Sequence, residues 1–186
     1  MSRLSAIRPE TATGKQKELF DAIQKRLGRV PNMMRTMAQS PAVLEGYVAL
    51  SGALAGGMLG ARLRQQIALA TAQANECTYC LSAHAAIGGQ VGLAPDEIAA
   101  ARGAMAADRR TDAALKFARL VLDRRGDVRD DDVAAILGAG FTEGEVAEII
   151  AHVALNTFTN YFNKAAGVEV DFPRIPLATE AMAGRR

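Results

Sequence analysis

The sequence has no excess of charge of one sign, no long apolar run and only two cysteines, and each shortage narrows the possible functions. Its 22 basic and 20 acidic residues give a net charge of +2. The short basic runs Arg109-Arg110, Arg124-Arg125 and Arg185-Arg186 lie beside acidic residues or at the end of the sequence. Scattered charge of this kind does not form a nucleic-acid-binding surface, so no nucleic-acid partner is expected.

No apolar run approaches the roughly 18 residues that span a bilayer, and the first residues lack the hydrophobic core of a signal peptide. We therefore expect no membrane partner and a cytoplasmic protein. Hydrophobic residues make up 49% of the sequence. This composition at 186 residues predicts one globular domain over residues 1–186, with N-terminal helical and C-terminal extended additions to its core.

The apolar residues recur at spacings of three and four, which predicts an all-α fold. The first helix is expected from about Thr13 to Leu27, with Gly28 as its stop. Helices are then expected from Pro31, from Pro41 to the pair Gly56-Gly57, and over 61–74. Further boundaries are predicted from capping residues and glycines, with starts at Asn75, Asp96, Thr111 and Thr142, and ends at Gly126, Gly140 and Gly167.

The C-terminal tail after Gly167 contains two prolines and cannot be helical throughout. It is nevertheless too apolar for a free linker. We expect it to pack on a neighbour. We also expect an oligomer, because of this apolar tail and because the helices have too much apolar face for an isolated domain of this size. The apolar residues concerned are Val168, Val170, Phe172, Ile175 and Leu177.

Both cysteines lie within the stretch "NECTYCLSAH". Cys77, Cys80 and His84 are spaced i, i+3 and i+7, which places them on one face of a helix. In a reducing compartment such a pair indicates redox or metal chemistry before a structural disulfide. A helix N-terminus and a nearby imidazole both favour the thiolate, so the pair can exchange with disulfides or attack a peroxide. Because the i, i+3 spacing brings the two sulfurs within bonding distance, we expect Cys77 and Cys80 to form an intramolecular disulfide on mild oxidation.

Two other interpretations of the cysteines stay open. Cys77, Cys80, His84 and His152 have the composition of a Cys2His2 zinc site, although the last residue is distant in the sequence. The cysteines could also pack as small buried hydrophobic residues with no chemistry.

A polar stripe runs along the last long helix, which is otherwise apolar. Its members are spaced by three or four residues and so share one face. They need hydrogen-bond partners, which helix ends or a symmetry mate could supply. The functional alternative is that His152 and Asn156 line a pocket around the thiols. The stripe consists of Glu148, His152, Asn156, Thr159 and Asn163.

The stretch "LRQQIALATAQANECTYCLSAH" resembles the core motif of the AhpD-like alkylhydroperoxidase and carboxymuconolactone decarboxylase superfamily. The similarity continues through "LGRVPNMM" and "HVALNTFTNYFN" and looks like the peroxidase-related branch. The resemblance implies an AhpD-like helical fold that assembles as a homotrimer or homohexamer. It also implies that Cys80 is the peroxidatic thiol, Cys77 its partner and proton donor, and His84 the base.

Two positions depart from the family motif. The relay glutamate is replaced by Gln65, and the intervening histidine is replaced by Tyr79. An amide cannot accept and return a proton as a carboxylate does, so the relay is weakened or is supplied by another group. The candidates for that group are Glu148, Glu76 and His152.

The function expected from the sequence is a thiol peroxidase that reduces organic hydroperoxides and requires neither a cofactor nor a metal. The resemblance implies a dithiol reductant, such as a lipoyl domain or a thioredoxin-like protein. The alternatives are a redox-responsive interaction protein without peroxide turnover and a structural zinc protein. The intact pair of thiols argues against decarboxylase activity.

Overall fold

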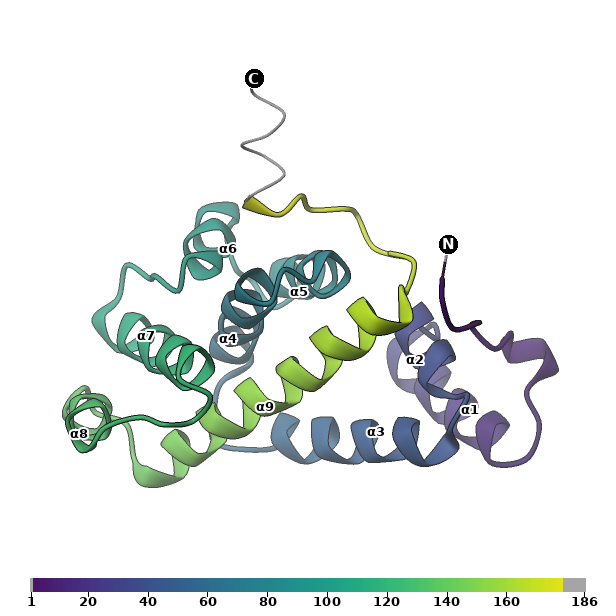
Figure 1. Cartoon of the computed structure of the whole chain (residues 1–186), viewed down its shortest axis with the longest axis horizontal. Coiled ribbons are helices and arrows are strands. Elements are labelled where there is room, and N and C mark those ends of the chain that lie inside the picture. The colour runs from purple at the N-terminus through teal and green to yellow at the C-terminus, as the bar shows by residue number, and fades with distance from the viewer. Residues whose placement is uncertain (1, 179–186) are drawn as a thin grey trace, which may run out of the picture.

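The computed structural model describes residues 2–178, which form nine α-helices, one short 3-10 turn and no strand (Figure 1). The predicted all-α class is therefore confirmed. No helix in this range has both the length and the apolar character needed to cross a membrane. The elements are η1 (Pro9–Thr11), α1 (Gly14–Leu27), α2 (Asn32–Met37), α3 (Pro41–Ala55), α4 (Ala61–Ala74), α5 (Thr78–Gln90), α6 (Pro95–Arg102), α7 (Arg109–Asp123), α8 (Asp130–Gly138) and α9 (Glu143–Ala166).

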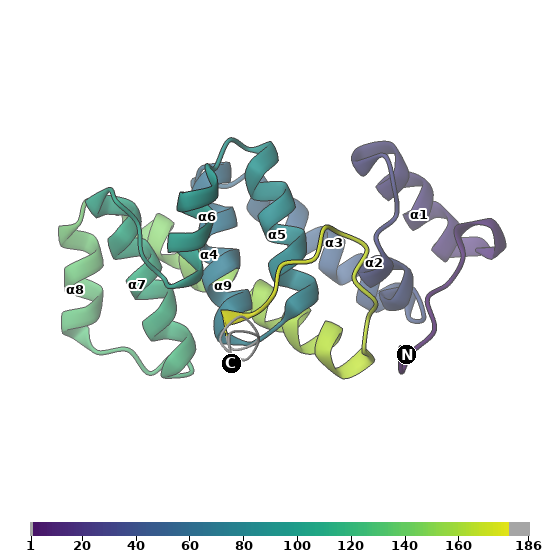
Figure 2. The same cartoon turned by 90° about the horizontal axis from the view of Figure 1, so that it is seen from above.

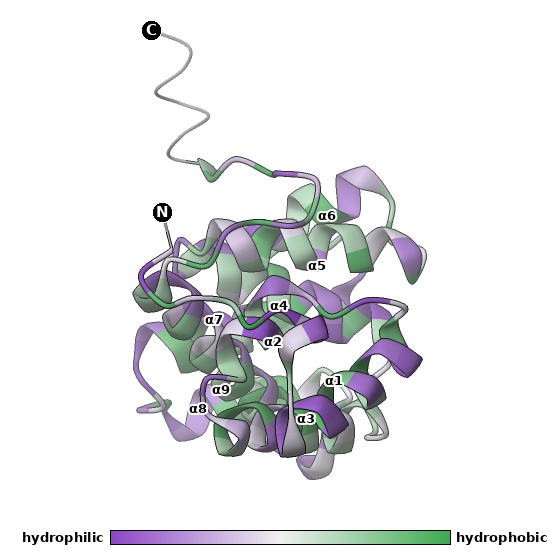
Figure 3. Ribbon diagram, turned by 90° about the vertical axis from the view of Figure 1, so that its right-hand side faces the viewer, coloured by the Kyte–Doolittle hydropathy of each residue, from purple (hydrophilic) through white to green (hydrophobic). Residues whose placement is uncertain are grey.

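Helix α4 lies at the centre of the fold and contacts α5, α6, α7 and α9. Seven consecutive residues, 66–72, are buried. A helix covered on every side must be formed by small or apolar residues, and the alanine-rich sequence of α4 meets this condition. Hydrophobic and hydrophilic residues alternate along most of the other helices, as expected of amphipathic helices around a core (Figure 3). One cluster of buried residues extends from Ala12 to Leu177.

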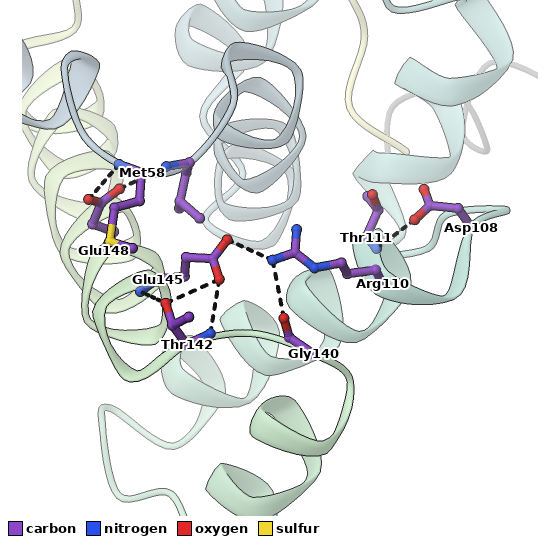
Figure 4. Close-up of polar contacts among 9 residues, drawn as sticks. Met58, Asp108, Arg110, Thr111, Gly140, Thr142, Glu145 and Glu148 are labelled. Atoms are coloured by element: carbon purple, nitrogen blue, oxygen red, sulfur yellow. Dashed lines mark hydrogen bonds and ion pairs between the residues drawn. The ribbon is translucent and has the colours of Figure 1, made fainter.

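Helix α9 is the longest element, with 24 residues. Its start at Thr142 is confirmed: the Thr142 hydroxyl accepts a hydrogen bond from the Glu145 backbone, and the Glu145 carboxylate accepts one from the Thr142 backbone (Figure 4). Arg110 of α7 donates to the same carboxylate at 2.6 Å (Figure 4). The helix ends at Gly167, where a φ of 64° gives the left-handed turn that glycine favours. Between these ends α9 passes beneath α4 and α5 and beside α3 (Figure 1).

Three of the predicted helix starts are wrong. Asn75 ends α4 instead of starting α5, because the chain turns at Glu76 with a φ of 53° and leaves Cys77 at the N-cap. Helix α6 begins at Pro95, so Asp96 lies inside its first turn. Helix α7 begins after Asp108, whose carboxylate accepts the Thr111 backbone N–H at 2.9 Å (Figure 4). Proline in the first turn of α6 and aspartate at the N-cap of α7 are favoured at helix starts, whereas α5 begins after Cys77, whose sulfur accepts the Cys80 backbone N–H.

Several boundaries agree with the sequence. The first helix spans Gly14–Leu27 and ends at Gly28, whose φ of 72° is left-handed. Helix α3 starts after Ser40 and ends at Gly56, although the Ser40 side chain makes no capping hydrogen bond. Gly126 and Gly140 also have a positive φ, but they lie three residues beyond the end of α7 and two residues beyond the end of α8.

Over the residues that the structure describes, the apolar tail packs on its own chain. The tail crosses α5 of its own chain (Figure 2). Phe172 packs edge-on against Tyr79 with the ring centroids 5.7 Å apart. The Ile175 backbone N–H donates to the buried Ser82 hydroxyl at 3.0 Å. Val168 and Leu177 are buried within the chain, and Val170, Phe172 and Ile175 are partly buried against the same core; residues 179–186 of the expected tail lie outside the described range.

Candidate active site

The two cysteines meet at the start of α5. Cys77 is the N-cap, and its Sγ accepts the backbone N–H of Cys80 at 3.3 Å. The two residues are joined as a disulfide, with their Cα atoms 5.4 Å apart. This pairing within one turn was predicted from the i, i+3 spacing. Both residues are buried, and Cys80 lines a cavity.

The cavity has a volume of about 640 Å³. Its walls come from the N-terminal helices α1, α2 and α3 on one side and from α4, α5, α9 and the tail on the other. A space of this size accommodates a small organic molecule. The apolar lining residues are Leu27, Pro31, Met33, Met34, Ala55, Ala68, Ala83, Ala86, Ile87, Leu155, Phe172 and Pro173.

The Cys80 sulfur receives a hydrogen bond from a buried amide. Asn163 Nδ2 lies 3.1 Å from Cys80 Sγ and 3.2 Å from the sulfur of Met33. A donor aimed at sulfur stabilises the thiolate more than the thiol. The arrangement therefore favours an ionised Cys80 whenever the disulfide is reduced.

His84 lies one helical turn beyond Cys80 and lines the same cavity. Its Nδ1 lies 2.9 Å from Oε1 of Gln65, so the residue at the relay position does contact the histidine. Although the ring partly faces the cavity, the surrounding protein lowers the His84 pKa to about 4 by desolvation. The Asn156 side chain opposes this shift, and the nearby His152 adds to it. His84 is therefore neutral at physiological pH.

His152 and Asn156 line the cavity, as the functional interpretation of the polar stripe predicted. Asn156 Nδ2 donates to the His152 carbonyl at 2.8 Å, which leaves the amide oxygen for other partners. His152 is 6% exposed, and its Nε2 has no hydrogen-bond partner in the described structure. Burial and the neighbouring Arg64 lower the His152 pKa, and Glu148 acts in the opposite direction.

Tyr79 also lines the cavity. Its hydroxyl accepts the Met33 backbone N–H at 3.2 Å, and its ring packs against Phe172. Burial raises the pKa of the hydroxyl well above its ordinary value. The residue that replaces the motif histidine thus connects α5 to α2 and to the tail, and it remains protonated.

The two glutamates proposed as relay groups do not line the cavity. The Glu148 carboxylate accepts the backbone N–H groups of Met58 and Leu59 at 2.7 and 3.0 Å (Figure 4). These bonds lower its pKa, that of Met58 having the largest effect. Glu76 is exposed in the turn before Cys77. Of the three candidates, only His152 lines the cavity.

Sequence reasoning missed several residues of the cavity. The stripe included Asn163, but nothing indicated its contact with Cys80. Arg26, Arg29 and Arg64 were not identified as site residues, because arginine is common on helix surfaces. Asp171, which pairs with Arg29 at 3.4 Å, was also missed.

The geometry does not favour a zinc site. Among residues 2–178, no group of three or more histidine, cysteine or acidic residues could hold a metal ion. Cys77 and Cys80, which would supply two of the four ligands, are bonded to each other.

The profile of the carboxymuconolactone decarboxylase family matches residues 41–123, which include α3, α4 and the cysteine pair. No curated protein sequence matches the chain. Among solved structures, a peroxidase-related protein from Ralstonia eutropha JMP134 with an AhpD core has 27% identity and a TM-score of 0.82, with 91% of this chain and 92% of that chain covered. A peroxidase-related protein from Silicibacter sp. TM1040 has 22% identity and a TM-score of 0.80, with 96% and 93% covered.

A third similar structure is a variant of the debrominase Bmp8 in complex with 2,3,4-tribromopyrrole, with 19% identity and a TM-score of 0.77. The alignment covers 92% of each chain. The present chain thus shares its fold with a protein whose name indicates a reaction other than peroxide reduction. Residues 41–123 thus match the carboxymuconolactone decarboxylase family, and the chain as a whole shares its fold with the two peroxidase-related proteins.

Proposed function

We propose that the protein is a thiol-dependent peroxidase that reduces organic hydroperoxides. The observation that carries the proposal is the Cys77–Cys80 disulfide, which lies at a helix N-terminus with Cys80 on the wall of a mainly apolar cavity. A redox-active pair needs a favoured thiolate, access for a substrate and a partner sulfur within bonding distance. All three conditions are met at Cys80.

In the first step the Cys80 thiolate attacks the distal oxygen of the hydroperoxide. The O–O bond breaks, Cys80 becomes a sulfenic acid, and the alkoxide leaves as an alcohol after taking up one proton. Cys77 and His84 are the candidate proton donors. Asn163 Nδ2 lies where it can hydrogen-bond the sulfur throughout this step.

In the second step the Cys77 thiol attacks the Cys80 sulfenic acid. The disulfide forms and one water is released. An external dithiol, such as a dihydrolipoyl group or a thioredoxin-like protein, then reduces the disulfide and becomes a disulfide itself. The described structure corresponds to the oxidised state of this cycle.

His84 acts as a weak base in this scheme. Its pKa of about 4 lies far below the 8.5 of an ordinary thiol, so it removes the Cys80 proton less readily than a histidine paired with a carboxylate. Gln65 orients the ring but supplies no charge. The helix N-terminus and Asn163 therefore contribute most of the thiolate stabilisation.

Reductive dehalogenation is a second candidate, favoured by the shared fold with the debrominase bound to tribromopyrrole. The same dithiol could replace bromine by hydrogen on an aromatic ring, giving the arene, hydrogen bromide and the Cys77–Cys80 disulfide. This reaction and peroxide reduction end in the same disulfide, so the substrate must decide between them.

The deciding experiment uses the reduced full-length protein, with a dihydrolipoyl compound as donor. We expect steady consumption of an alkyl hydroperoxide, and we expect Cys77→Ser to trap a Cys80 sulfenic acid that mass spectrometry detects with a dimedone-type probe. Cys80→Ser should show neither effect. Oxidation to the disulfide without repeated turnover would instead identify a redox-responsive interaction protein. Consumption of 2,3,4-tribromopyrrole without hydroperoxide turnover would identify a dehalogenase.

We further propose that the chain assembles with copies of itself, as the family resemblance implies for a trimer or hexamer. An exposed apolar strip on α9 supports this proposal. Ile150, Phe158 and Tyr161 are 43%, 41% and 60% exposed and lie on one side of the helix. A strip of this kind is a common feature of subunit interfaces.

A further inference from the structure

The cavity has a polar end that the proposed chemistry does not use. Arg64, in the first turns of α4, and His152, on α9, both line it. The two side chains are close enough for the Arg64 charge to lower the His152 pKa. We propose that this end of the cavity binds the carboxylate of an amphipathic substrate whose apolar body extends along α9 toward Cys80. The reaction of the bound substrate rests on the proposed function, whereas its binding does not.

The unpartnered nitrogen of His152 is the first observation. Buried polar atoms almost always have a partner, because a missing hydrogen bond costs free energy. His152 Nε2 is buried, lies on a residue that lines the cavity, and has no partner in the described structure. A ligand oxygen next to this nitrogen would satisfy it.

The charge of the cavity wall is the second observation. Three arginines, Arg26, Arg29 and Arg64, line the cavity, while Asp171 is the one carboxylate among the lining residues in the described range 2–178. Arg29 is paired with Asp171 and covers the Phe172 ring. The wall therefore has a surplus of positive charge that favours an anion.

Arg64 is better placed than Arg26 to hold that anion. Its Nη1 donates to the Leu59 carbonyl, which fixes the guanidinium while its other N–H groups remain for a ligand. Glu148 lies near enough for the Arg64 charge to lower its pKa, but the two carboxylate oxygens of Glu148 already accept backbone N–H groups. Arg26 is exposed at the end of α1, and of these two arginines Arg64 is the one whose charge affects the His152 pKa.

Helix α9 gives the spacing between the anionic end and the reactive sulfur. His152, Asn156, Thr159 and Asn163 all line the cavity and share one face of the helix. His152 and Asn163 are separated by about 16 Å along the axis, at roughly 1.5 Å per residue. Since Asn163 contacts Cys80, a molecule that reaches both ends must be elongated. Leu155, which lies between His152 and Asn163 on α9, is one of the apolar side chains that line the cavity. These features fit a chain carboxylic acid bearing a hydroperoxide.

Binding can be tested without catalysis, with the oxidised protein and unreactive ligands. We expect dodecanoate to bind about tenfold or more tightly than dodecanol by isothermal titration calorimetry, because only the acid forms charge-assisted hydrogen bonds. Arg64→Gln should remove most of this difference. Arg62→Gln is the matched control, because it removes the same charge from an exposed side chain of α4 that pairs with Glu97.

A second readout does not depend on the stability of the Arg64 variant. In the wild-type protein, dodecanoate should raise the His152 pKa measured by NMR, and dodecanol should not, since a nearby anion favours the charged imidazole. Equal affinity for acid and alcohol, or a loss of acid preference in Arg26→Gln but not in Arg64→Gln, would overturn the assignment. If dodecanoate binds as expected but no hydroperoxide is consumed, the anion site stands and the peroxidase proposal fails.

Discussion

The Nδ1 atom of His84 lies 2.9 Å from the Oε1 atom of Gln65, so a neutral amide occupies the position of the relay carboxylate in the family motif. The amide holds the ring in place but has no negative charge, so it stabilises an imidazolium less than a carboxylate would. Desolvation accordingly keeps the His84 pKa low. This pair provides the most direct test of how the site handles protons.

We expect Gln65→Glu to increase peroxide turnover. A carboxylate beside Nδ1 should raise the His84 pKa by about 1 to 3 units and make the ring a better base for the Cys80 thiol. Steady-state rates and an NMR titration of His84 would measure both effects. Gln65→Met, which removes the acceptor without adding charge, is the control. A raised pKa with unchanged turnover would show that His84 does not move the thiol proton.

Asn163→Leu should make Cys80 less reactive. Loss of the 3.1 Å hydrogen bond to the sulfur should raise the thiol pKa and slow sulfenic-acid formation by about tenfold at pH 7. Alkylation of reduced Cys80 as a function of pH would report the thiol pKa directly. Asn163→Asp places an anion beside the sulfur and should raise the pKa further. If alkylation in both variants had the same pH dependence as in the wild-type protein, Asn163 would have no effect on the Cys80 thiol.

Glu148→Gln should lower stability more than activity. The carboxylate holds the backbone N–H groups of Met58 and Leu59, so the weaker amide acceptor should cost about 1 to 2 kcal/mol of unfolding free energy. A Cβ added to Gly57 would approach the carboxylate oxygens, so Gly57→Ala should disturb the same contact. Urea unfolding and peroxidase assays of both variants would separate the two effects. A large loss of turnover in a stable Glu148→Gln protein would identify Glu148 as a relay after all.

The stability of the protein should fall as the pH decreases from about 6.5 toward 4. Both histidines of the chain have a pKa below the ordinary 6.5, and that of His84 is about 4. The unfolded chain binds more protons than the folded protein in this interval. The contribution of the two neutral histidines to the unfolding free energy is therefore complete above pH 6.5 and is lost as the pH falls. Urea unfolding at pH 7 and pH 5 would measure the difference. His84→Gln should reduce the change in unfolding free energy between these two pH values. An unchanged difference would show that folding does not lower the His84 pKa.

Self-association can be measured by size-exclusion chromatography with light scattering. We expect a trimer or hexamer, and we expect Phe158→Glu combined with Tyr161→Glu to shift the protein toward monomer. Met105→Glu is the control, because Met105 is also exposed, at 55%, but lies outside α9. A monomeric wild-type protein at micromolar concentration would contradict the proposed assembly.

The sequence was sufficient for features that depend on local spacing. The 3.6-residue period predicted the helices, and Gly28, Thr142 and Gly167 marked boundaries correctly because left-handed turns and capping boxes are local structures. The i, i+3 spacing of Cys77 and Cys80 predicted their pairing for the same reason. Caps such as Asn75 were misplaced where two neighbouring residues could both begin a helix.

Tertiary structure alone decided what surrounds the cysteines. Asn163 reaches Cys80 across 83 positions of sequence, and His84 meets Gln65 across 19. Such contacts depend on how α4, α5 and α9 cross, and many crossings are compatible with one hydrophobic pattern. The sequence therefore determined which residues form the cysteine pair, while packing determined that Glu148 faces a loop, that the tail covers α5, and that Arg64 and His152 share one cavity.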